Sequence, residues 1–272
     1  MQLTHQQIQQ FHEAVWDYYR EHKRIMAWRE HPTPYSVLVS ELMLQQTQVN
    51  RVLPKFQEFM LRFPTVISLA DAPLAEVLRV WSGLGYNRRA KFLHAAAQVV
   101  VEKYGGVIPA TFTELVTLPG VGKNTAGAVL AYAYNQPVVF IETNIRSVFF
   151  HHFFADVSDI DDKDLLPLIQ QTLDQENPRE WYWALMDYGA HLKQTAGNNI
   201  ARSRHYARQS KFEGSRRQIR GRVVRALLRG PQPLSQLAEV VEHDQRLPVV
   251  LQDLAGEGFV VSEAGLYRLT DF

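Results

Sequence analysis

The sequence contains no cysteine among its 272 residues. A chain without thiols forms no disulfide, offers no thiolate to a metal ion or an iron–sulfur cluster, and has no cysteine nucleophile. It also lacks an apolar run of membrane-spanning length, and residues 1–22 are amphipathic and mixed in charge, unlike a signal peptide. These absences predict a cytoplasmic protein without a membrane partner.

Metal-ligand spacings and nucleotide-binding fingerprints are missing as well. His151 and His152 are adjacent, so they point in different directions on a helix, and His191 and His205 have no second ligand at metal spacing. We therefore predict no metal site. The stretch LPGVGKNTAG at 118–127 has its glycines only two apart, which does not fit a nucleotide P-loop.

The composition is that of an ordinary globular chain, with 46% hydrophobic and 21% charged residues, and it can fill a large core in two domains. Helical periodicity dominates, and strand signals are few. We expect an all-α fold. The predicted helices cover residues 5–22, 34–46, 50–62, 65–71, 74–80, 87–104, 111–117, 123–134, 141–153, 162–174 and 178–192.

The pattern changes near Gly214, where a second unit is predicted to begin. Three helical stretches are followed by two short β-like runs around a turn, which is typical of a winged helix. Such modules bind duplex DNA in some proteins and protein partners in others. The expected helices are 215–230, 233–241 and 247–258, and the expected hairpin at 259–269 turns at 263–265.

Positive charge is concentrated although the net charge is only +1. Between Lys193 and Arg229 eleven basic residues accompany a single acid, Glu213. A compact basic segment in a near-neutral protein predicts a polyanion partner such as DNA. The alternative is a solvated linker between two domains. The arginines that we expect to contact DNA are Arg202, Arg204, Arg208, Arg216 and Arg220.

A glycine-punctuated turn joins the predicted helices at 111–117 and 123–134. Glycines let backbone N–H groups approach an anion, and the dipole of a following helix favours that anion. The turn therefore indicates a helix-hairpin-helix that holds a DNA phosphate without reading a base. An ordinary tight turn between packed helices also fits. The expected phosphate contacts are Leu118, Gly120, Val121, Gly122 and Lys123.

Two glutamates are candidates for chemistry. Glu41 lies in YSVLVSELMLQQTQV, whose apolar residues leave hardly any polar face, and a desolvated carboxyl has the raised pKa that a general acid needs. Glu142 follows the apolar run PVVFI, where an ionised carboxylate could stabilise positive charge on a substrate. The alternative for Glu41 is a buried structural carboxyl that accepts hydrogen bonds from backbone amides. The alternative for Glu142 is a glutamate at a helix N-terminus that interacts favourably with the helix dipole.

Four motifs together resemble one known family. They are ELMLQQTQV at 41–49, WSGLGYNRRA at 81–90, LPGVGKNTAGAVL at 118–130 and LMDYGA at 185–190. The chain is similar, over residues 20–195, to the helix-hairpin-helix (HhH-GPD) DNA glycosylases, and among them to the MutY-type adenine glycosylases. The resemblance implies two all-α subdomains, a double-stranded DNA partner containing a lesion or mismatch, and hydrolysis of the N-glycosidic bond of a flipped base.

The resemblance also assigns roles to single residues. Glu41 matches the general acid that protonates the base, Glu142 the carboxylate that stabilises an oxocarbenium-like sugar, and Asn144 a residue that supports this carboxylate. Gln46 and Tyr86 match residues that fill or wedge the base stack.

Two further positions concern the base pocket and the type of reaction. Trp28 matches a wall of the base pocket. Asn124 stands where bifunctional members carry a lysine nucleophile, so the resemblance implies a monofunctional glycosylase.

The chain departs from the family in three ways. The family's catalytic aspartate is the longer Glu142. The cluster cysteines are replaced by Lys193, Ile200, Ser203 and Gln209, so we expect no iron–sulfur cluster and no other cofactor. A winged helix stands where the family carries a β-rich domain that reads 8-oxoguanine.

The expected organisation is a glycosylase body at 1–210 and a winged-helix-like domain at 214–272. Within the body, a six-helix barrel would span 32–136, and a second helical subdomain would combine 1–31 and 137–210.

The sequence thus predicts a nucleoid-associated, monomeric base-excision enzyme whose preferred base is adenine opposite 8-oxoguanine or guanine. The alternatives are the same chemistry on uracil, thymine, hypoxanthine or an oxidised or hydroxymethylated pyrimidine, and a DNA-binding protein without catalysis.

Overall fold

The computed structural model describes residues 1–155, 157–197, 199–204, 206 and 211–270. They form two compact units. One comprises Met1–Glu41, Ile108–Thr117 and Val121–Arg208, and the other comprises Leu42–Val107, Leu118–Gly120 and Gln209–Phe272. Strands occur only in one small sheet of the described chain, so the predicted all-α class is confirmed.

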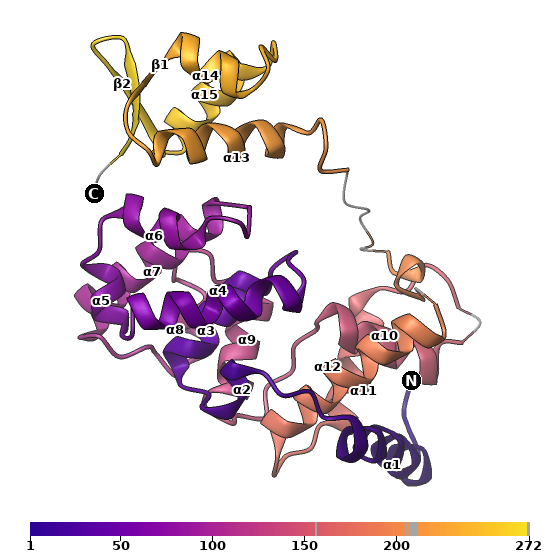
Figure 1. Ribbon diagram of the computed structural model, residues 1–272. Coiled ribbons are helices and arrows are strands. Elements are labelled where there is room, and N and C mark those ends of the chain that lie inside the picture. The colour runs from indigo at the N-terminus through magenta and orange to yellow at the C-terminus, as the bar shows by residue number, and fades with distance from the viewer. Residues whose placement is uncertain (156, 198, 205, 207–210, 271–272) are drawn as a thin grey trace. The chain divides into compact units, whose positions relative to one another are not determined.

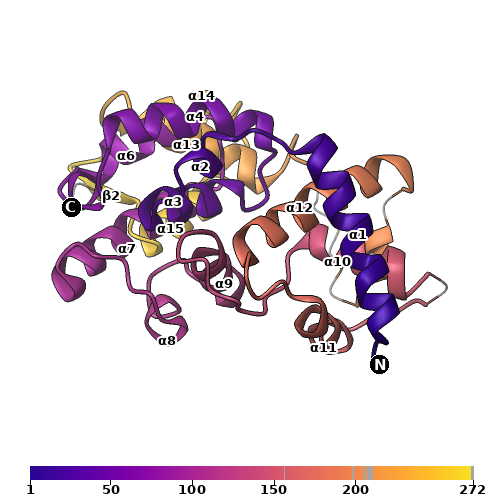
Figure 2. The same cartoon turned by 90° about the horizontal axis from the view of Figure 1, so that it is seen from below.

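The first unit is built around α12, which contacts α1, α9 and α10 (Figures 1 and 2). Its helix α1 begins at a capping box, in which Thr4 and Gln7 bond reciprocally to backbone amides. Helices α2 and η1 are too short for a periodic signal, and the sequence did not predict them. The elements are α1 (His5–His22), α2 (Ala27–Glu30), α3 (Pro34–Leu44) as far as Glu41, α8 (Phe112–Leu115), α9 (Lys123–Tyr132), α10 (Thr143–Phe153), α11 (Asp162–Thr172), α12 (Pro178–Thr195) and η1 (Asn199–Arg202).

Aromatic side chains fill the contact between α1, α10 and α12. The ring of Phe11 lies 5.2 Å from Phe149, 5.0 Å from Phe153 and 5.8 Å from Trp181, measured between centroids. Tilted and edge-on aromatic pairs at these distances add to the stabilisation from burial alone. Three helices that are distant in sequence are thereby fixed against one another.

Helices α10 and α12 approach so closely that one position between them accepts only glycine. A Cβ at Gly189 would overlap the Asn144 carbonyl oxygen and lie 2.7 Å from the carbonyl carbon. Both atoms belong to the backbone, so neither can move aside as a flexible side chain would.

We predict that Gly189→Ala lowers the free energy of unfolding by about 1–3 kcal/mol, because overpacking forces the two helices apart. The matched control is Gly221→Ala in α13, where an added Cβ meets nothing within 4 Å. This control should raise stability by about 0.5–1 kcal/mol. Urea-induced unfolding measures both variants, and equal effects at the two glycines would contradict the packing described.

The second unit contains α4 (Val49–Arg62), α5 (Val66–Ala70), α6 (Leu74–Trp81) and α7 (Arg88–Tyr104). The longest, α7, buries a stripe that includes Ala90, Leu93, Ala97 and Val100 against α5 and α6. It ends at Gly105, whose φ of 61° is left-handed and whose N–H donates to the Val100 carbonyl. The sequence placed this helix and its end correctly.

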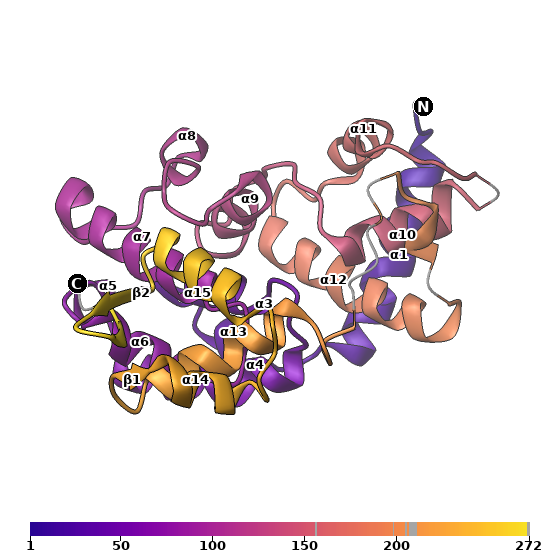
Figure 3. The ribbon, with the colours of Figure 1, turned by 90° about the horizontal axis from the view of Figure 1, so that it is seen from above.

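The C-terminal part of this unit has helices in the order expected of a winged helix. Its strands form an antiparallel sheet in the order β1-β3-β2, of which Figure 3 labels β1 and β2. The sequence predicted the β2–β3 hairpin but not β1, because two residues carry no alternation. The elements are α13 (Arg216–Leu227), β1 (Gln232–Pro233), α14 (Leu234–Val240), α15 (Leu247–Gly256), β2 (Val260–Glu263) and β3 (Leu266–Leu269).

Among the described residues, no helix combines the length and the apolar character needed to cross a membrane.

Candidate active site

Glu41 lies on α3 between residues that are almost completely buried. Val39 and Ser40 precede it, Leu42 and Met43 follow it, and each of the four is at most 1% exposed. Burial and, to a smaller extent, the charge of Glu142 raise the pKa of Glu41 to about 8, and Arg29 opposes the shift. The carboxyl therefore holds a proton at neutral pH, as the apolar pattern of α3 predicted.

Glu142 occupies the position just before α10, with an extended backbone at φ −110° and ψ 160°. Burial raises its pKa, but the Thr143 amide and the charges of Arg146 and Lys193 oppose the rise. Its charge in turn raises the pKa of Glu41. The Thr143 amide and two cations thus favour the ionised form of Glu142, and its charge favours the protonated form of Glu41, so the pair suits one acid and one carboxylate.

A buried ion pair supports this pair of carboxyls. The guanidinium of Arg29 is bidentate with Asp187, at 2.9 and 3.0 Å, and the two side chains are 7% and 0% exposed. The backbone N–H and the Nε of Arg24 donate to the same carboxylate at 3.0 and 2.7 Å. Asp187 therefore fixes the cation whose charge acts on Glu41.

Asn144, two residues after Glu142, contacts Lys193. Lys193, from α12, donates from Nζ to the Asn144 side-chain oxygen at 2.6 Å. Burial lowers the pKa of Lys193 to about 8, although the charge of Glu142 opposes this shift.

Tyr132 comes from the end of α9 and is 6% exposed. Burial raises the pKa of its phenol well above the usual range, and Glu41 and Glu142 both add to the shift. Because charge interactions fall with distance, this neutral hydroxyl lies near both carboxyls.

The residues predicted to wedge the base stack, Gln46 and Tyr86, belong to the second unit. Both have left-handed backbones, with φ of 56° and 48°, which are uncommon away from glycine and cluster at functional sites. The guanidinium of Arg89 holds both segments: it donates to the Leu42 and Met43 carbonyls at 2.9 and 2.8 Å and to the Gly85 carbonyl at 3.1 Å.

The predicted hairpin joins α8 to α9. Gly120 has a φ of +77°, and a Cβ there would lie 2.7 Å from Phe92 Cβ, so conformation and packing both require glycine. Leu118 and Val121 are buried, whereas Gly122 and Lys123 are exposed at the start of α9. The buried pair fixes the turn, and the exposed pair faces solvent.

Two predicted pocket residues differ in exposure. Trp28 on α2 is 5% exposed, whereas Asn124 is exposed in the first turn of α9. Both lie in the first unit, together with the two glutamates.

The basic segment is largely paired within the protein. Arg202 donates to the Phe150 and Phe154 carbonyls at the end of α10, at 3.3 and 2.7 Å. Arg204 pairs with Asp159 and Asp161. The remaining predicted contacts are Arg216, which pairs with Asp253, Arg220, which pairs with Glu257, and Arg208, which lies outside the described residues.

The positions of the family's cluster cysteines do not fit an iron–sulfur cluster. Lys193 is engaged with Asn144, and Ile200 and Ser203 are each 7% exposed. A hydrogen-bond network ties this segment to its surroundings, since Asn199 exchanges two bonds with Ser147 at 2.8 and 2.9 Å. Gln209 lies outside the described residues.

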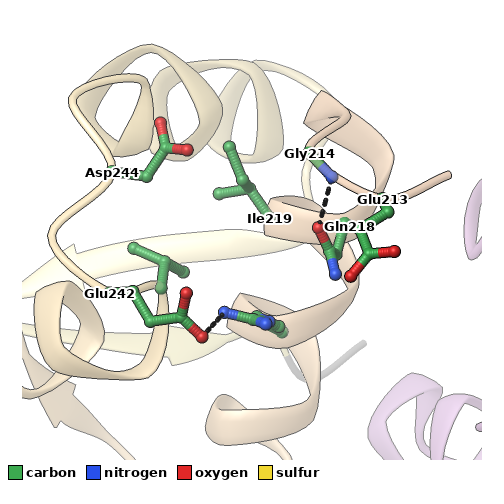
Figure 4. Close-up of a pocket in the computed structure, with 8 residues that line it drawn as sticks. Glu213, Gly214, Gln218, Ile219, Glu242 and Asp244 are labelled. Carbon is green, nitrogen blue, oxygen red and sulfur yellow. Dashed lines mark hydrogen bonds and ion pairs between the residues drawn. The ribbon is translucent and has the colours of Figure 1, made fainter. Parts of the chain in front are cut away.

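No group of three or more His, Asp or Glu within the described ranges could hold a metal ion. A pocket in the C-terminal part is lined by Glu213, Gln218, Arg222 and Glu242, among others (Figure 4). In it Arg222 pairs with Glu242 at 2.7 Å. None of the predicted site residues lines this pocket.

Comparison with known proteins gives the family. The profile described as "HhH-GPD superfamily base excision DNA repair protein" matches residues 39–170. The adenine DNA glycosylase of Mycobacterium tuberculosis (strain ATCC 25618 / H37Rv) is 34% identical over 284 residues, which cover 89% of this chain and 92% of that protein. The chain therefore belongs to the HhH-GPD superfamily of base excision DNA repair proteins. Within it, the chain is similar to the MutY-type adenine DNA glycosylases, as the motifs predicted.

Other relatives match only in part. The adenine DNA glycosylase of Buchnera aphidicola subsp. Baizongia pistaciae is 34% identical over 185 residues, which cover 66% of this chain and 52% of the relative. The chain thus spans about half the length of this relative. A solved structure of a thermostable thymine-DNA glycosylase has a TM-score of 0.62 at 25% identity, covering 68% of this chain and 87% of that one.

Sequence reasoning did not assign a site role to Arg29, Tyr132, Asp187 or Arg89. Arg29 directly follows Trp28, and Asp187 stood inside the quoted motif LMDYGA, which was the available signal. Their pairing across 158 positions is a product of tertiary packing and has no local pattern.

Proposed function

We propose that this protein is a monofunctional DNA glycosylase of base excision repair whose preferred base is adenine opposite 8-oxoguanine or guanine. The observation that carries the proposal is the half-buried pair of Glu41 and Glu142, in which burial and the charge of Glu142 favour a protonated Glu41 while nearby cations favour an ionised Glu142. Hydrolysis of a glycosidic bond needs these two states together.

The proposed reaction uses both carboxyls. Glu41 donates its proton to a ring nitrogen of the flipped base, and the bond between the sugar C1′ and the base breaks, with its electrons leaving on the base. The carboxylate of Glu142 stabilises the cationic sugar and accepts a proton from the water whose oxygen bonds to C1′. The products are the free base and an abasic site, and Asn144 supports Glu142.

The base pocket is proposed to contain Trp28 and Asn124, with Gln46 and Tyr86 acting in the base stack. Asn124 has a neutral amide and therefore cannot form a Schiff base, which supports hydrolysis without strand cleavage through that position. No cofactor enters this scheme, because the chain has no cysteine for a cluster.

Double-stranded DNA containing a lesion or mismatch is the proposed partner, bound by the monomer. The hairpin at Leu118–Gly122 and the exposed Lys123 would hold one phosphate at the N-terminus of α9. Three of the predicted arginines would have to break their ion pairs with carboxylates before they could bind DNA phosphates, namely Arg204, Arg216 and Arg220. We therefore rank their contribution below that of Lys123 and of the exposed Arg225, neither of which has a charged partner among the described residues.

A gel assay on a duplex panel tests this proposal, with alkali added after incubation to cut abasic sites. The panel pairs adenine with 8-oxoguanine or guanine, and includes uracil, thymine, hypoxanthine and hydroxymethyluracil. Cleavage of adenine duplexes only after alkali is expected. Strand cleavage without alkali would contradict the monofunctional reaction. No cleavage of any duplex would contradict the proposal that the protein is a glycosylase.

Excision of a pyrimidine is the second candidate, because the structural neighbour at 25% identity is a thymine-DNA glycosylase and because Glu142 is longer than the family's aspartate. In that case the same panel would show cleavage at thymine or uracil and none at adenine.

The protonation states predict a bell-shaped dependence of kcat/KM on pH. Glu41 acts only when protonated, so kcat/KM should fall above its pKa of about 8, by about tenfold per pH unit. Glu142 acts only when ionised, and its pKa is raised, so the midpoint of the acidic limb should lie at a pH above the ordinary pKa of a glutamate. A profile that stays flat from pH 7 to pH 9.5 would contradict the assignment of Glu41.

The stability of the protein should follow the same pKa. The folded chain binds a proton at Glu41 that the unfolded chain has released between pH 4.5 and about 8. The contribution of Glu41 to stability is therefore fully present below pH 4.5 and is lost as the pH rises to about 8.

A further inference from the structure

Lys193 and Gly189 lie one turn apart on the same face of α12, and both face Asn144. Gly189 lets the Asn144 backbone approach α12, since any Cβ there would overlap the Asn144 carbonyl oxygen. Four residues later, the Lys193 side chain reaches the Asn144 amide at 2.6 Å. One face of α12 thus contacts both the backbone and the side chain of Asn144, which lies two residues after Glu142.

The hydrogen bond fixes the orientation of the Asn144 amide. An ammonium group only donates, so the atom facing Lys193 is the side-chain oxygen Oδ1. The amide nitrogen Nδ2 consequently points away from Lys193, and no described residue accepts a hydrogen bond from it. The hydrogen bond from Lys193 thereby leaves Nδ2 of Asn144 available to donate a hydrogen bond.

Two cations act on Glu142, and only one of them is uncompensated. Arg146 forms a bidentate pair with Asp162, at 2.7 and 2.6 Å, so its charge is largely offset. Lys193 forms no ion pair with a carboxylate among the described residues, and its ammonium is half-buried, where charge interactions are stronger than in water.

We propose that Lys193 is a positioning residue of the active site, which orients the Asn144 amide and keeps the Glu142 carboxylate ionised. This proposal rests on the proposed function and deepens it. Glu142 is half-buried and must still carry its charge when the sugar becomes cationic, so a nearby cation is required to offset the loss of solvent. At this position the family resemblance places a cluster cysteine, so in this chain the same position serves the chemistry directly.

The absence of cysteine allows a sharp test. Lys193→Cys introduces the sole thiol of the chain, and 2-bromoethylamine converts it to aminoethylcysteine, which restores an ammonium group at the length of lysine. Iodoacetamide gives a neutral side chain of similar size. Lys163→Cys, at an exposed position on α11, is the matched control. Intact mass confirms each modification.

The single-turnover excision rate should fall about 10- to 100-fold in Lys193→Cys, recover after aminoethylation, and stay low after reaction with iodoacetamide. DNA affinity and the Lys163→Cys forms should remain within about twofold of wild type. An unchanged rate in Lys193→Cys, or equal rates in its two alkylated forms, would overturn the proposal. Lys193→Met replaces Lys193→Cys if the thiol variant does not fold.

A second readout is independent of catalysis. Titration of the ¹³C-labelled Glu142 carboxyl by NMR, with the resonance assigned by its loss in Glu142→Gln, should show a higher pKa in Lys193→Cys and recovery after aminoethylation. If the wild type cleaves no duplex but this shift is present, the proposed function fails while the positioning role stands. If the Glu142 pKa does not move, the positioning role is overturned whatever the activity.

Discussion

Replacing Glu41 by glutamine should reduce the single-turnover excision rate by about 10²–10⁴-fold, the contribution typical of a general acid. Glutamine has nearly the shape of a protonated glutamate, so it preserves packing on α3 and removes only the transferable proton. Single-turnover kinetics with enzyme in excess isolate this step from product release.

DNA affinity should remain nearly intact in Glu41→Gln, because the proposed phosphate contacts lie on the hairpin and elsewhere. Gel-shift titration with uncleaved duplex measures it. Glu176→Gln is the matched control, since this glutamate is exposed and should leave the rate unchanged. Turnover at the wild-type rate in Glu41→Gln would remove Glu41 from the mechanism.

Asp187→Asn should lower the free energy of unfolding by about 3–5 kcal/mol, because it leaves a buried guanidinium without its counter-charge. Arg29 is 7% exposed and has its bidentate partner only in Asp187 among the described carboxylates. In the asparagine variant an amide N–H2 group would face guanidinium donors, so one of the two hydrogen bonds from Arg29 is also lost.

Urea-induced unfolding, followed by tryptophan fluorescence and by circular dichroism, measures this effect. The matched control is Asp17→Asn: Asp17 is 65% exposed and pairs with Arg20 on the surface. Exposed pairs contribute at most about 1 kcal/mol, so this control should change little. Equal stability losses in the two variants would show that the Arg29–Asp187 pair has no special role.

Much of the helical framework could be predicted from sequence because its signals are local. The helix at 5–22 has a capping box at its start, and the helix at 87–104 has a glycine at its end. The elements that were missed, α2, η1 and β1, have four, four and two residues, which show no clear period, whereas the equally short α8 was predicted within the stretch 111–117.

The two glutamates of the site were visible in the sequence because each follows or occupies an apolar run. The apolar run also predicted the raised pKa of Glu41, but the groups that act on the two carboxyls were not visible, since folding brings them together. Arg29 and Asp187 are 158 positions apart, and Lys193 and Asn144 are 49 apart. No periodicity or motif length connects such positions, so only the packing of α12 on the remaining helices reveals them.

For the basic segment, the sequence overestimated how many arginines are available to bind DNA. Its arginines gave a strong signal for a polyanion, yet Arg202 caps the end of α10 and Arg204 pairs with two aspartates. Charge counted along the chain does not show which side chains folding has already paired.

Chromatography of the base released from a duplex that pairs adenine with 8-oxoguanine, under single-turnover conditions, directly tests the roles of the two glutamates. Free adenine should appear at the rate at which alkali-labile sites form, with the strand intact before alkali, and Glu41→Gln should release none above background. Release of no base, or equal release by the variant, would contradict the account of Glu41 and Glu142 as an excision pair.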